Sequence, residues 1–502
     1  MGAIGTIAVM KQLNAAGHQV IEFERYSTSN KIWETKVKRL RVPDLLCLRC
    51  GERFESRAKS KLGIIMSDSP SSDERHWDHG LRSEDSAVFL ACHQENGQWI
   101  PAPHIYVYRI GQLQQSLKFS RLGLPKSQSE GSERDRMWPS KVPSYSGIIQ
   151  SVAMSKDGTS KVVQILKDNH KRQSARIPLE FVVNVRAGER ILANSSIIAA
   201  VVASRKDFTC VSSDYNFIHD LTYGDDEVTQ FAAIKALGYL PSTSGTAALV
   251  EFIENHPIDV GSPYLQQQLL ILDALASLIR GNTPHASDSL RKLRDIIFHA
   301  KGNASLQMES VLILGELVSS DTTEAVLTIL LEIGTSTQLA SEVRAAAVWY
   351  ATTKVSLDNL DRFVPFLADT DDIVRLHAIA GMQGRLTAEM KSSFLPYFNE
   401  DGYLPGSLVA LISHQSEIFV PDLIGDLLHN KLTTKQADWI LYLLGRIPHG
   451  THLTAEDLPE GHRSKIRFLR HTLIRDWLED PLLQQDYHSL LQQRILESRV
   501  DP

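Results

Sequence analysis

Two carboxylates and a lysine lie close together in the sequence, within RVPDLLCLRCGERFESRAKSK (residues 41–61). Asp44 precedes a Cys-x-x-Cys-Gly turn, Glu55 follows the turn, and Lys59 comes four residues later. Carboxylate oxygens suit Mg²⁺, which activates water and stabilises the extra charge on phosphorus during hydrolysis. A neighbouring cation supports the nucleophile and the phosphate. These residue types predict hydrolysis of phosphodiesters, with Mg²⁺ or Mn²⁺ held by the two carboxylates.

The second half of the predicted hairpin includes Glu55, Arg57 and Lys59, which are charged and spaced two residues apart. Alternation along a strand puts Glu55, Arg57 and Lys59 on the same face. Arginine is a poor proton acceptor. We therefore expect Lys59 to orient the attacking water and Arg57 to hold a phosphate.

The register of this hairpin decides whether the carboxylates meet. A turn centred just after Gly51 would set Asp44 across from Lys59 and leave Glu55 too far along to share a metal. A turn centred two residues earlier, with Gly51 in the left-handed conformation, would pair Asp44 with Glu55. Their Cβ atoms would then lie about 5 Å apart.

The order of helix, strand, Pro-Asp strand, turn and Glu strand resembles the PD-(D/E)xK nuclease superfamily over residues 5–61. The resemblance implies a restriction-endonuclease-like α/β domain, which we place at residues 1–121. It also implies that Asp44 and Glu55 bind the metal and that Lys59 is the catalytic lysine.

The chain departs from that family pattern in two places. The family has Glu-x-Lys, whereas here Arg57 stands two residues after Glu55 and Lys59 comes two residues later. The first predicted helix has no carboxylate, although many family members have a glutamate there. Glu22 or Glu24 on the next strand can substitute for it. The displaced lysine favours the alternative that the nuclease fold has lost its activity.

The turn also contains half of a zinc-ribbon signature, formed by Cys47 and Cys50. His76 and His79 can supply the other half, which completes a tetrahedral set for Zn²⁺. The Cys-His pair at 92–93 is an alternative source of ligands. Without zinc, the two cysteines are small buried residues at the end of a hairpin. The histidines then lie in a loop, where they can line the mouth of the active site.

Charge is distributed unevenly along the chain. Residues 1–150 carry 21 Lys and Arg against 16 Asp and Glu, a net charge of +5, which leaves −11 for the rest of a chain whose total is −6. The basic end predicts an anionic partner, nucleic acid, with Lys36, Lys38 and Arg39 contacting phosphates beside Arg57. A solvated basic hairpin explains the charge equally well.

Several protein classes are disfavoured by the sequence. It contains no apolar run of 18 residues, so we expect no membrane-spanning helix. Four cysteines among 502 residues do not form a disulfide framework, and we expect a reducing, cytoplasmic location. P-loops, dinucleotide fingerprints and nucleophile elbows are absent, which argues against ATP hydrolysis and hydride transfer.

Composition changes twice after the first domain. Residues 122–145 are rich in Ser, Pro and charge, as in a linker or a loop. Residues 146–212 contain short apolar runs between turn residues, which predicts a small β-barrel or β-sandwich module.

From 221 to 450, apolar residues recur at helical spacing in segments of about 30–40 residues, which is the range of helical repeats. The starts that resemble one another most are DDEVTQFAAIKALGYL (225–240), SEVRAAAVWYAT (341–352) and DDIVRLHAIAGM (371–382). Such helix pairs stack into a solenoid. The Asp-x-Val-Arg start of the last segment resembles HEAT repeats, which implies an α-solenoid that binds a protein partner. Residues 451–502 are predicted to be terminal capping helices.

Taken together, these features predict a multidomain α+β protein in which a metal-dependent nuclease is joined to a HEAT-like scaffold. By analogy of architecture, such a fusion suits genome defence or DNA repair. The alternative is a non-catalytic adaptor or a nucleic-acid-binding protein with a zinc-knuckle N-terminal domain. The sequence leaves open whether the substrate is DNA or RNA, and it does not give the oligomeric state.

Overall fold

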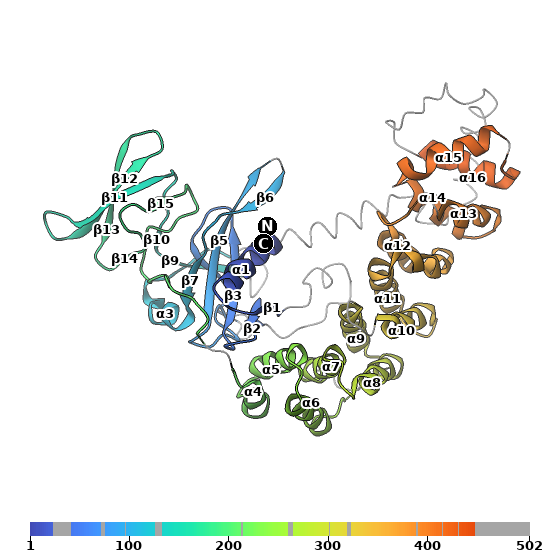
Figure 1. Ribbon diagram of the computed structural model, residues 1–502, viewed down its shortest axis with the longest axis horizontal. Coiled ribbons are helices and arrows are strands. Elements are labelled where there is room, and N and C mark those ends of the chain that lie inside the picture. Colours follow the sequence, from blue (N-terminus) through green and yellow to red (C-terminus); the bar gives the residue numbers. More distant parts are fainter. Residues whose placement is uncertain are drawn as a thin grey trace. The chain divides into compact units, whose positions relative to one another are not determined.

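The computed structural model describes residues 1–23, 42–71, 76–95, 97–125, 133–211, 214–259, 265–300, 302–318, 323–387, 390–413, 415–429 and 431–446. These residues form two compact units, one up to Asn255 and the other from His256 onward. The first unit is rich in β-strands and the second is a run of packed helices (Figure 1). The predicted multidomain α+β architecture is confirmed at this level.

Some predictions fall on other parts of the chain. Lys36, Lys38 and Arg39 lie outside the described residues, as do Glu24 and the predicted capping helices at 451–502. Among the helices that the structure describes, none is long and apolar enough to cross a membrane.

The centre of the first unit is a six-stranded mixed sheet. Its strands are β1 (Val20–Glu22), β2 (Leu45–Cys47), β3 (Arg53–Lys59), β5 (Ser86–Glu95), β6 (Gln98–Pro101) and β7 (Tyr106–Arg109). β1, β2 and β3 form an antiparallel meander, and β3 then runs parallel to β5. β5 also pairs antiparallel with β6 and β7. The first seven residues of β5 are buried, as expected of a strand inside the unit.

Helix α1 (Gly2–Ala15) packs on β3 and β5 of this sheet (Figure 1). Apolar residues recur at helical spacing in this segment, and Gly17 follows it in the sequence. Gly17 has a φ of 87°, a left-handed conformation that glycine adopts at low cost and that ends a helix. The chain then turns into β1.

The buried face of α1 does not follow the large apolar residues of the helix. Ile7, Met10 and Leu13 recur at helical spacing, but Ile7 is 53% exposed. Gly5 lies on the buried side instead, and a Cβ placed there would stand 2.4 Å from the Cβ of Ala58. The helix therefore presents its small residues to β3, because this allows the two backbones to approach closely.

A second sheet corrects the predicted linker at 122–145. It contains β4 (Ile64–Asp68), β8 (Arg121–Leu122) and β9 (Arg134–Trp138), and β9 pairs antiparallel with the whole of β4. Trp138 is buried and meets Trp77 edge to face, with 4.9 Å between ring centroids. The polar composition concealed this strand because only its last residue is fully buried.

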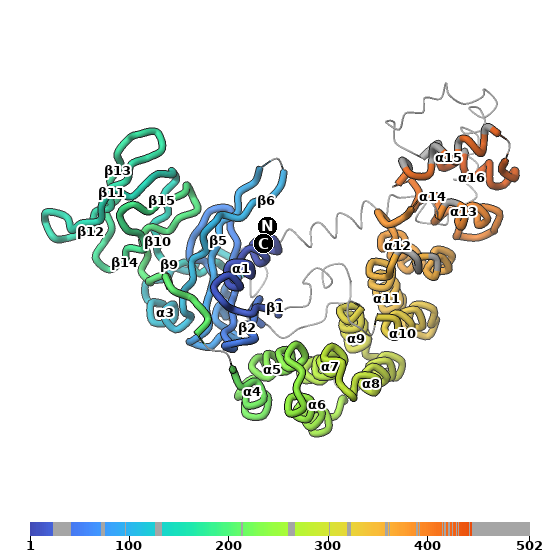
Figure 2. Tube along the Cα trace, in the orientation of Figure 1, coloured from blue at the N-terminus to red at the C-terminus, as the bar shows by residue number. Residues whose placement is uncertain are grey.

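The next part of the first unit forms a smaller group of curled sheets (Figure 2). Its strands are β10 (Ser140–Lys141), β11 (Gly147–Met154), β12 (Ser160–Lys167), β13 (Arg172–Pro178), β14 (Val182–Val183), β15 (Arg190–Ile191) and β16 (Ala199–Ala200). Ile149, Val163, Ile165 and Ile177 are almost fully buried and form a core for this group. The strands predicted within 146–212 are therefore present.

Three helices end the first unit and a longer run forms the second. The first three are α4 (Phe217–Tyr223), α5 (Glu227–Tyr239) and α6 (Thr243–Asn255). The second unit contains α7 (Leu265–Arg280), α8 (Ala286–His299), α9 (Ala304–Leu317), α10 (Thr323–Thr335), α11 (Ser341–Lys354), the 3-10 helix η3 (Leu357–Ala368), α12 (Asp372–Met382), α13 (Met390–Phe394), the 3-10 helix η4 (Leu395–Asn399), α14 (Leu404–Ser413), α15 (Ser416–Leu428) and α16 (Thr434–Arg446). Contacts join α7 to α9, α9 to α11, α11 to α12 and α12 to α14, so alternate helices stack.

The acidic residues at the predicted helix starts act as caps. The side chain of Asp226 accepts a hydrogen bond from the backbone N–H of Thr229, and Asp371 does the same for Ile373. Each bond satisfies an N–H group that has no partner within its helix. The acids shared by these starts therefore have a structural role.

The Val-Arg pairs that follow the acids are also structural. Arg344 and Arg375 are buried, and each donates to a backbone carbonyl, that of Gly334 at 2.9 Å and that of Asp369 at 2.7 Å. Arg344 also forms an ion pair with Asp369. These arginines connect successive helices of the second unit.

A buried ion pair joins the start of β3 to the start of β5 in the first unit. Nε of Arg53 donates to Oδ2 of Asp85 at 2.8 Å, and both side chains are at most 2% exposed. The backbone N–H groups of Arg53 and Arg82 also donate to Asp85. Burial nevertheless raises the pKa of the Asp85 carboxyl, against the attraction of Arg53. The guanidinium of Arg53 further contacts Thr229 of α5 at 3.4 Å.

We predict that Asp85→Asn lowers the free energy of unfolding of the first unit by about 3–5 kcal/mol, because it leaves a buried guanidinium without its counter-charge. Asp168→Asn is the matched control, since Asp168 pairs with Arg190 at 3.0 Å on the surface and should lose less than about 1 kcal/mol. Chemical denaturation followed by tryptophan fluorescence measures both. Equal losses would contradict the assigned role of the buried pair.

Candidate functional site

The turn between β2 and β3 sets the geometry of the candidate site. The N–H of Cys47 donates to the carbonyl of Glu52 at 2.9 Å, and the N–H of Gly51 donates to the carbonyl of Cys47 at 3.0 Å. Gly51 has a φ of 69°, the left-handed conformation on which one of the two predicted registers depended. The observed pairs Leu45–Phe54 and Leu46–Arg53 correspond to that register.

Continuing this register by one residue sets Asp44 across from Glu55. Oδ2 of Asp44 accepts the backbone N–H of Ser56 at 2.6 Å, so the carboxylate lies against β3 beside Glu55. The carbonyl of Asp44 accepts the N–H of Phe23 at 2.8 Å, which continues the pairing with β1. Asp44 is thus held between both of its neighbouring strands.

The charged face of β3 lies on the side away from α1. Gly5 and Thr6 of α1 approach Ala58 and Ser56 respectively, so the side chains at the odd-numbered positions of β3 point to the opposite face. These include Glu55, Arg57 and Lys59. The common face predicted from alternation is therefore the face that α1 leaves uncovered.

Arg57 and Lys59, two cations on this face, lie at different distances along the strand from Glu55. Arg57 forms an ion pair with Oε1 of Glu55, which is 8% exposed. Lys59 lies two residues further along, and a strand rises about 3.3 Å per residue. The ammonium of Lys59 therefore has to reach back along β3 to approach Glu55.

The predicted substitute for a helix carboxylate is not placed to assist. Glu22 pairs with Leu45 on β2, and Leu45 in turn pairs with Phe54, which shares the face covered by α1. Glu22 therefore points to the opposite face from Asp44 and Glu55.

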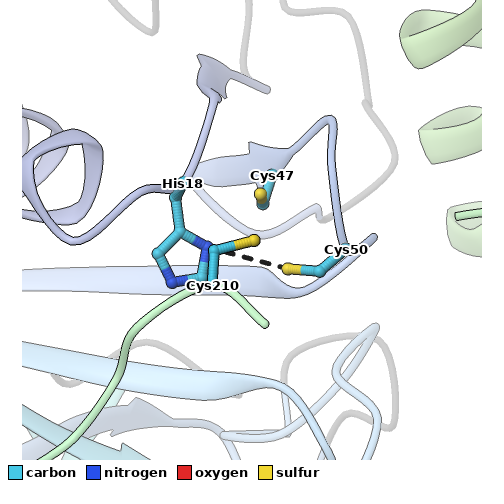
Figure 3. A group of neighbouring side chains, drawn as sticks. All are labelled: His18, Cys47, Cys50 and Cys210. Atoms are coloured by element: carbon cyan, nitrogen blue, oxygen red, sulfur yellow. Dashed lines mark hydrogen bonds between the residues drawn. The ribbon is translucent and has the colours of Figure 1, made fainter. Parts of the chain in front are cut away.

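A second group of side chains gathers beside the same turn. His18, Cys47, Cys50 and Cys210 converge, and their ligand atoms all lie within 4.8 Å of one another (Figure 3). His18 follows the left-handed Gly17 at the end of α1, the first two cysteines belong to the β2–β3 turn, and Cys210 follows β16. This set of one imidazole and three thiols can bind a structural zinc ion.

The ring of His18 is oriented by the backbone. Its Nε2 lies 2.7 Å from the carbonyl oxygen of Phe208, so Nε2 carries the proton and donates. Nδ1 is left with its lone pair and faces the sulfur of Cys50 at 3.6 Å (Figure 3). Burial lowers the pKa of His18, but the hydrogen bonds with Cys47 and with Phe208 outweigh burial and raise it.

The pKa values of the two thiols in the turn are shifted in opposite directions. The pKa of Cys47 is lowered because the side chain of Cys50 hydrogen-bonds to its sulfur and because His18 lies beside it. The backbone N–H groups of Cys50 and Gln19 also support the Cys47 thiolate. The pKa of Cys50 is raised by the same bond with Cys47 and by burial. One thiolate is therefore stabilised within this group even without a cation.

The predicted zinc set of Cys47, Cys50, His76 and His79 needs correction. Within the part of the chain that the structure describes, the two cysteines group with other ligands and not with these histidines. His76 instead contacts Asp78, with 2.5 Å between Nδ1 and Oδ1. Trp77, which lies between His76 and His79 in the sequence, is buried against Trp138. This contact keeps the histidine loop beside the second sheet and away from the cysteines.

Sequence reasoning missed His18 and Cys210 as ligands. His18 follows the glycine that ends α1, and no neighbouring residue in the sequence indicates that it is a metal ligand. Cys210 lies 160 residues beyond Cys50, so spacing rules for zinc motifs do not reach it. The sequence offered one signal for Cys210. The chain has four cysteines, so only Cys92 and Cys210 were left to complete the half signature formed by Cys47 and Cys50.

Comparisons with known proteins add no assignment. No protein-family model matches the chain, and no curated protein matches it significantly. Its function is therefore inferred from the geometry of this region.

We predict that Gly51→Ala destabilises the first unit more than Gly97→Ala does. Both glycines have a positive φ, which costs an L-residue about 1–2 kcal/mol. A Cβ at Gly51 would also lie 2.5 Å from ring atoms of Tyr215, whereas a Cβ at Gly97 would meet nothing within 4 Å. Chemical denaturation of the two variants measures the difference. A Gly51 variant no less stable than the Gly97 variant would show that the turn yields without cost.

Proposed function

We propose that the first unit is a metal-dependent nuclease that hydrolyses nucleic-acid phosphodiesters. The observation that carries this proposal is the β2–β3 register, which sets Asp44 across from Glu55 on neighbouring strands. The strand order also supports it, because a helix followed by an antiparallel meander and a parallel strand agrees with the resemblance to PD-(D/E)xK nucleases.

Asp44 and Glu55 are the proposed ligands of Mg²⁺ or Mn²⁺. Hard carboxylate oxygens suit such ions, and the register places the two Cβ atoms about 5 Å apart. When bound, the ion would supply activation of water and stabilisation of charge on phosphorus. Glu55 has to exchange its contact with Arg57 for the metal, which frees the guanidinium to hold a phosphate.

Lys59 is the proposed residue that orients the attacking water. It lies on the same face of β3 as the carboxylate of Glu55, and its flexible stem allows the ammonium to reach back along the strand. Lys61 lies just beyond the end of β3 and is exposed. This second lysine provides a comparison of equal charge.

The basic N-terminal segment supports nucleic acid as the partner of the first unit, with Lys36, Lys38 and Arg39 as proposed phosphate contacts. The stacked helices of the second unit, which we interpret as HEAT-like, are the proposed site for a protein partner. Genome defence or DNA repair suits this pairing by analogy of architecture.

A nucleic-acid binder without cleavage is the second candidate. The ion pair between Arg57 and Glu55 favours it, because this pair already neutralises one of the two carboxylates. The lysine displaced from the family position favours it as well. Binding through basic side chains would then survive removal of both carboxylates.

We predict that the wild-type chain cleaves labelled nucleic acid in Mg²⁺ or Mn²⁺ and not in a chelator. Single- and double-stranded DNA and RNA are tested in parallel. Asp44→Asn and Glu55→Gln should abolish cleavage, because each removes a proposed metal ligand. Lys59→Ala should reduce the rate by roughly 10²–10⁴-fold, the range typical of a lost acid–base group. Gel analysis of initial rates measures each effect.

Two matched controls accompany this experiment. Glu95→Gln removes an exposed carboxylate of β5, and Lys61→Ala removes an exposed lysine; both should cleave at the wild-type rate. Absence of cleavage by the wild type, with salt-sensitive binding that is unchanged in both carboxylate variants, would replace the nuclease with the binding protein.

A further inference from the structure

The nuclease proposal leaves one group of reactive side chains without a role. His18, Cys47, Cys50 and Cys210 lie beside the β2–β3 turn, and none of them belongs to the charged face of β3. Three thiols and an imidazole suit a borderline-soft ion, whereas Mg²⁺ prefers oxygen ligands. This group therefore requires a separate explanation from the carboxylates.

We propose that His18, Cys47, Cys50 and Cys210 bind one structural Zn²⁺ ion. Their ligand atoms lie within 4.8 Å of one another (Figure 3). Zn–S bonds of about 2.3 Å and Zn–N bonds of about 2.0 Å require ligand atoms to be roughly 3.5–4 Å apart in a tetrahedron. A small inward movement of the side chains is sufficient to close the site around the ion.

The surroundings of the ligands have the features of a prepared metal site. The carbonyl of Phe208 accepts the Nε2 proton of His18, which leaves Nδ1 available to the metal, as an outer-shell carbonyl does in known zinc sites. Backbone N–H groups of Gln19 and Cys50 lie at the sulfur of Cys47, and the N–H of Glu52 lies at the sulfur of Cys50. Such donors stabilise thiolates.

The number of convergent ligands distinguishes zinc from a disulfide. A Cys47–Cys50 disulfide would use two of the four groups and would leave Cys210 and the His18 lone pair without a function. None of the four cysteines, all of which the structure describes, forms a disulfide bond. A tetrahedral ion uses the complete set and leaves no position for water, which is typical of structural zinc.

The ion would join three segments that are far apart in the sequence. His18 lies after the end of α1, Cys47 and Cys50 lie at the turn between β2 and β3, and Cys210 lies in the segment that leads to α4. The carbonyl of Ala16 already accepts the N–H of Cys210 at 3.0 Å. Zinc would lock the turn that sets the register of β2 and β3. The proposal rests on this cluster and stands whether or not the unit cleaves nucleic acid.

The test begins with the metal content of the full-length chain, purified from zinc-supplemented cells without a metal-affinity tag. We expect about one zinc per chain by elemental mass spectrometry, and release of that zinc by a thiol-modifying mercurial. Replacement by Co²⁺ should give the intense sulfur-to-metal absorption of a thiolate site. Less than a tenth of an equivalent of zinc, or an intact mass two hydrogens lighter from a Cys47–Cys50 disulfide, would overturn the proposal.

Variants then assign the ligands. Cys210→Ser should weaken zinc binding by more than the roughly 10–100-fold that loss of an outer-shell partner costs. Cys210 is half-buried, and serine differs from cysteine only in its side-chain O atom, so we expect this variant to fold. Cys92→Ser is the matched control, since Cys92 lies on β5 apart from the group, and should retain one zinc per chain. Zinc affinity is measured by competition with a chromogenic chelator.

A chelator should also lower the melting temperature of the wild type and of Cys92→Ser, because a ligand bound only to the folded state stabilises that state. It should have a smaller effect on Cys210→Ser. Circular dichroism confirms that each variant is folded before zinc is measured. A folded Cys210→Ser variant that retains one zinc with wild-type affinity would overturn the assignment of Cys210.

Discussion

The left-handed turn at Gly51 is the constraint on which the rest of the first unit depends. It closes the short loop between β2 and β3 and so fixes their register. That register sets Asp44 beside Glu55, and the same turn brings Cys47 and Cys50 toward His18. A side chain at Gly51 would be strained by its φ and would collide with Tyr215. One backbone conformation thus serves both candidate metal sites.

The two candidate metal sites differ in chemical character. Asp44 and Glu55 offer hard oxygen ligands on the face of β3 that α1 leaves uncovered, as a catalytic Mg²⁺ site requires. The cysteines and His18 offer softer ligands in a closed group, as a structural Zn²⁺ site requires. Their proximity follows from the short turn. An ion in the second site would stiffen the hairpin that carries the first.

Charged side chains in both units show how position decides their role. Arg53 and Asp85 are buried as a pair and connect β3 with the start of β5. Arg344 and Arg375 are buried between helices and bind backbone carbonyls. When one partner is removed from such a site, the remaining charge stays buried without compensation, so the loss of stability is large. The residues that suggested helical repeats in the sequence therefore stabilise the helical run itself.

The sequence by itself determined the local features. Strand alternation, the stop at Gly17 and the acidic helix caps are set by backbone sterics and by hydrogen bonds between near neighbours. Tertiary structure alone decided which imidazole meets the cysteines, that residues 134–138 form a strand, and which face of α1 is buried. Those outcomes depend on segments brought together across tens to hundreds of residues. Close packing between such segments, and not local preference, selects His18, Cys210 and Gly5.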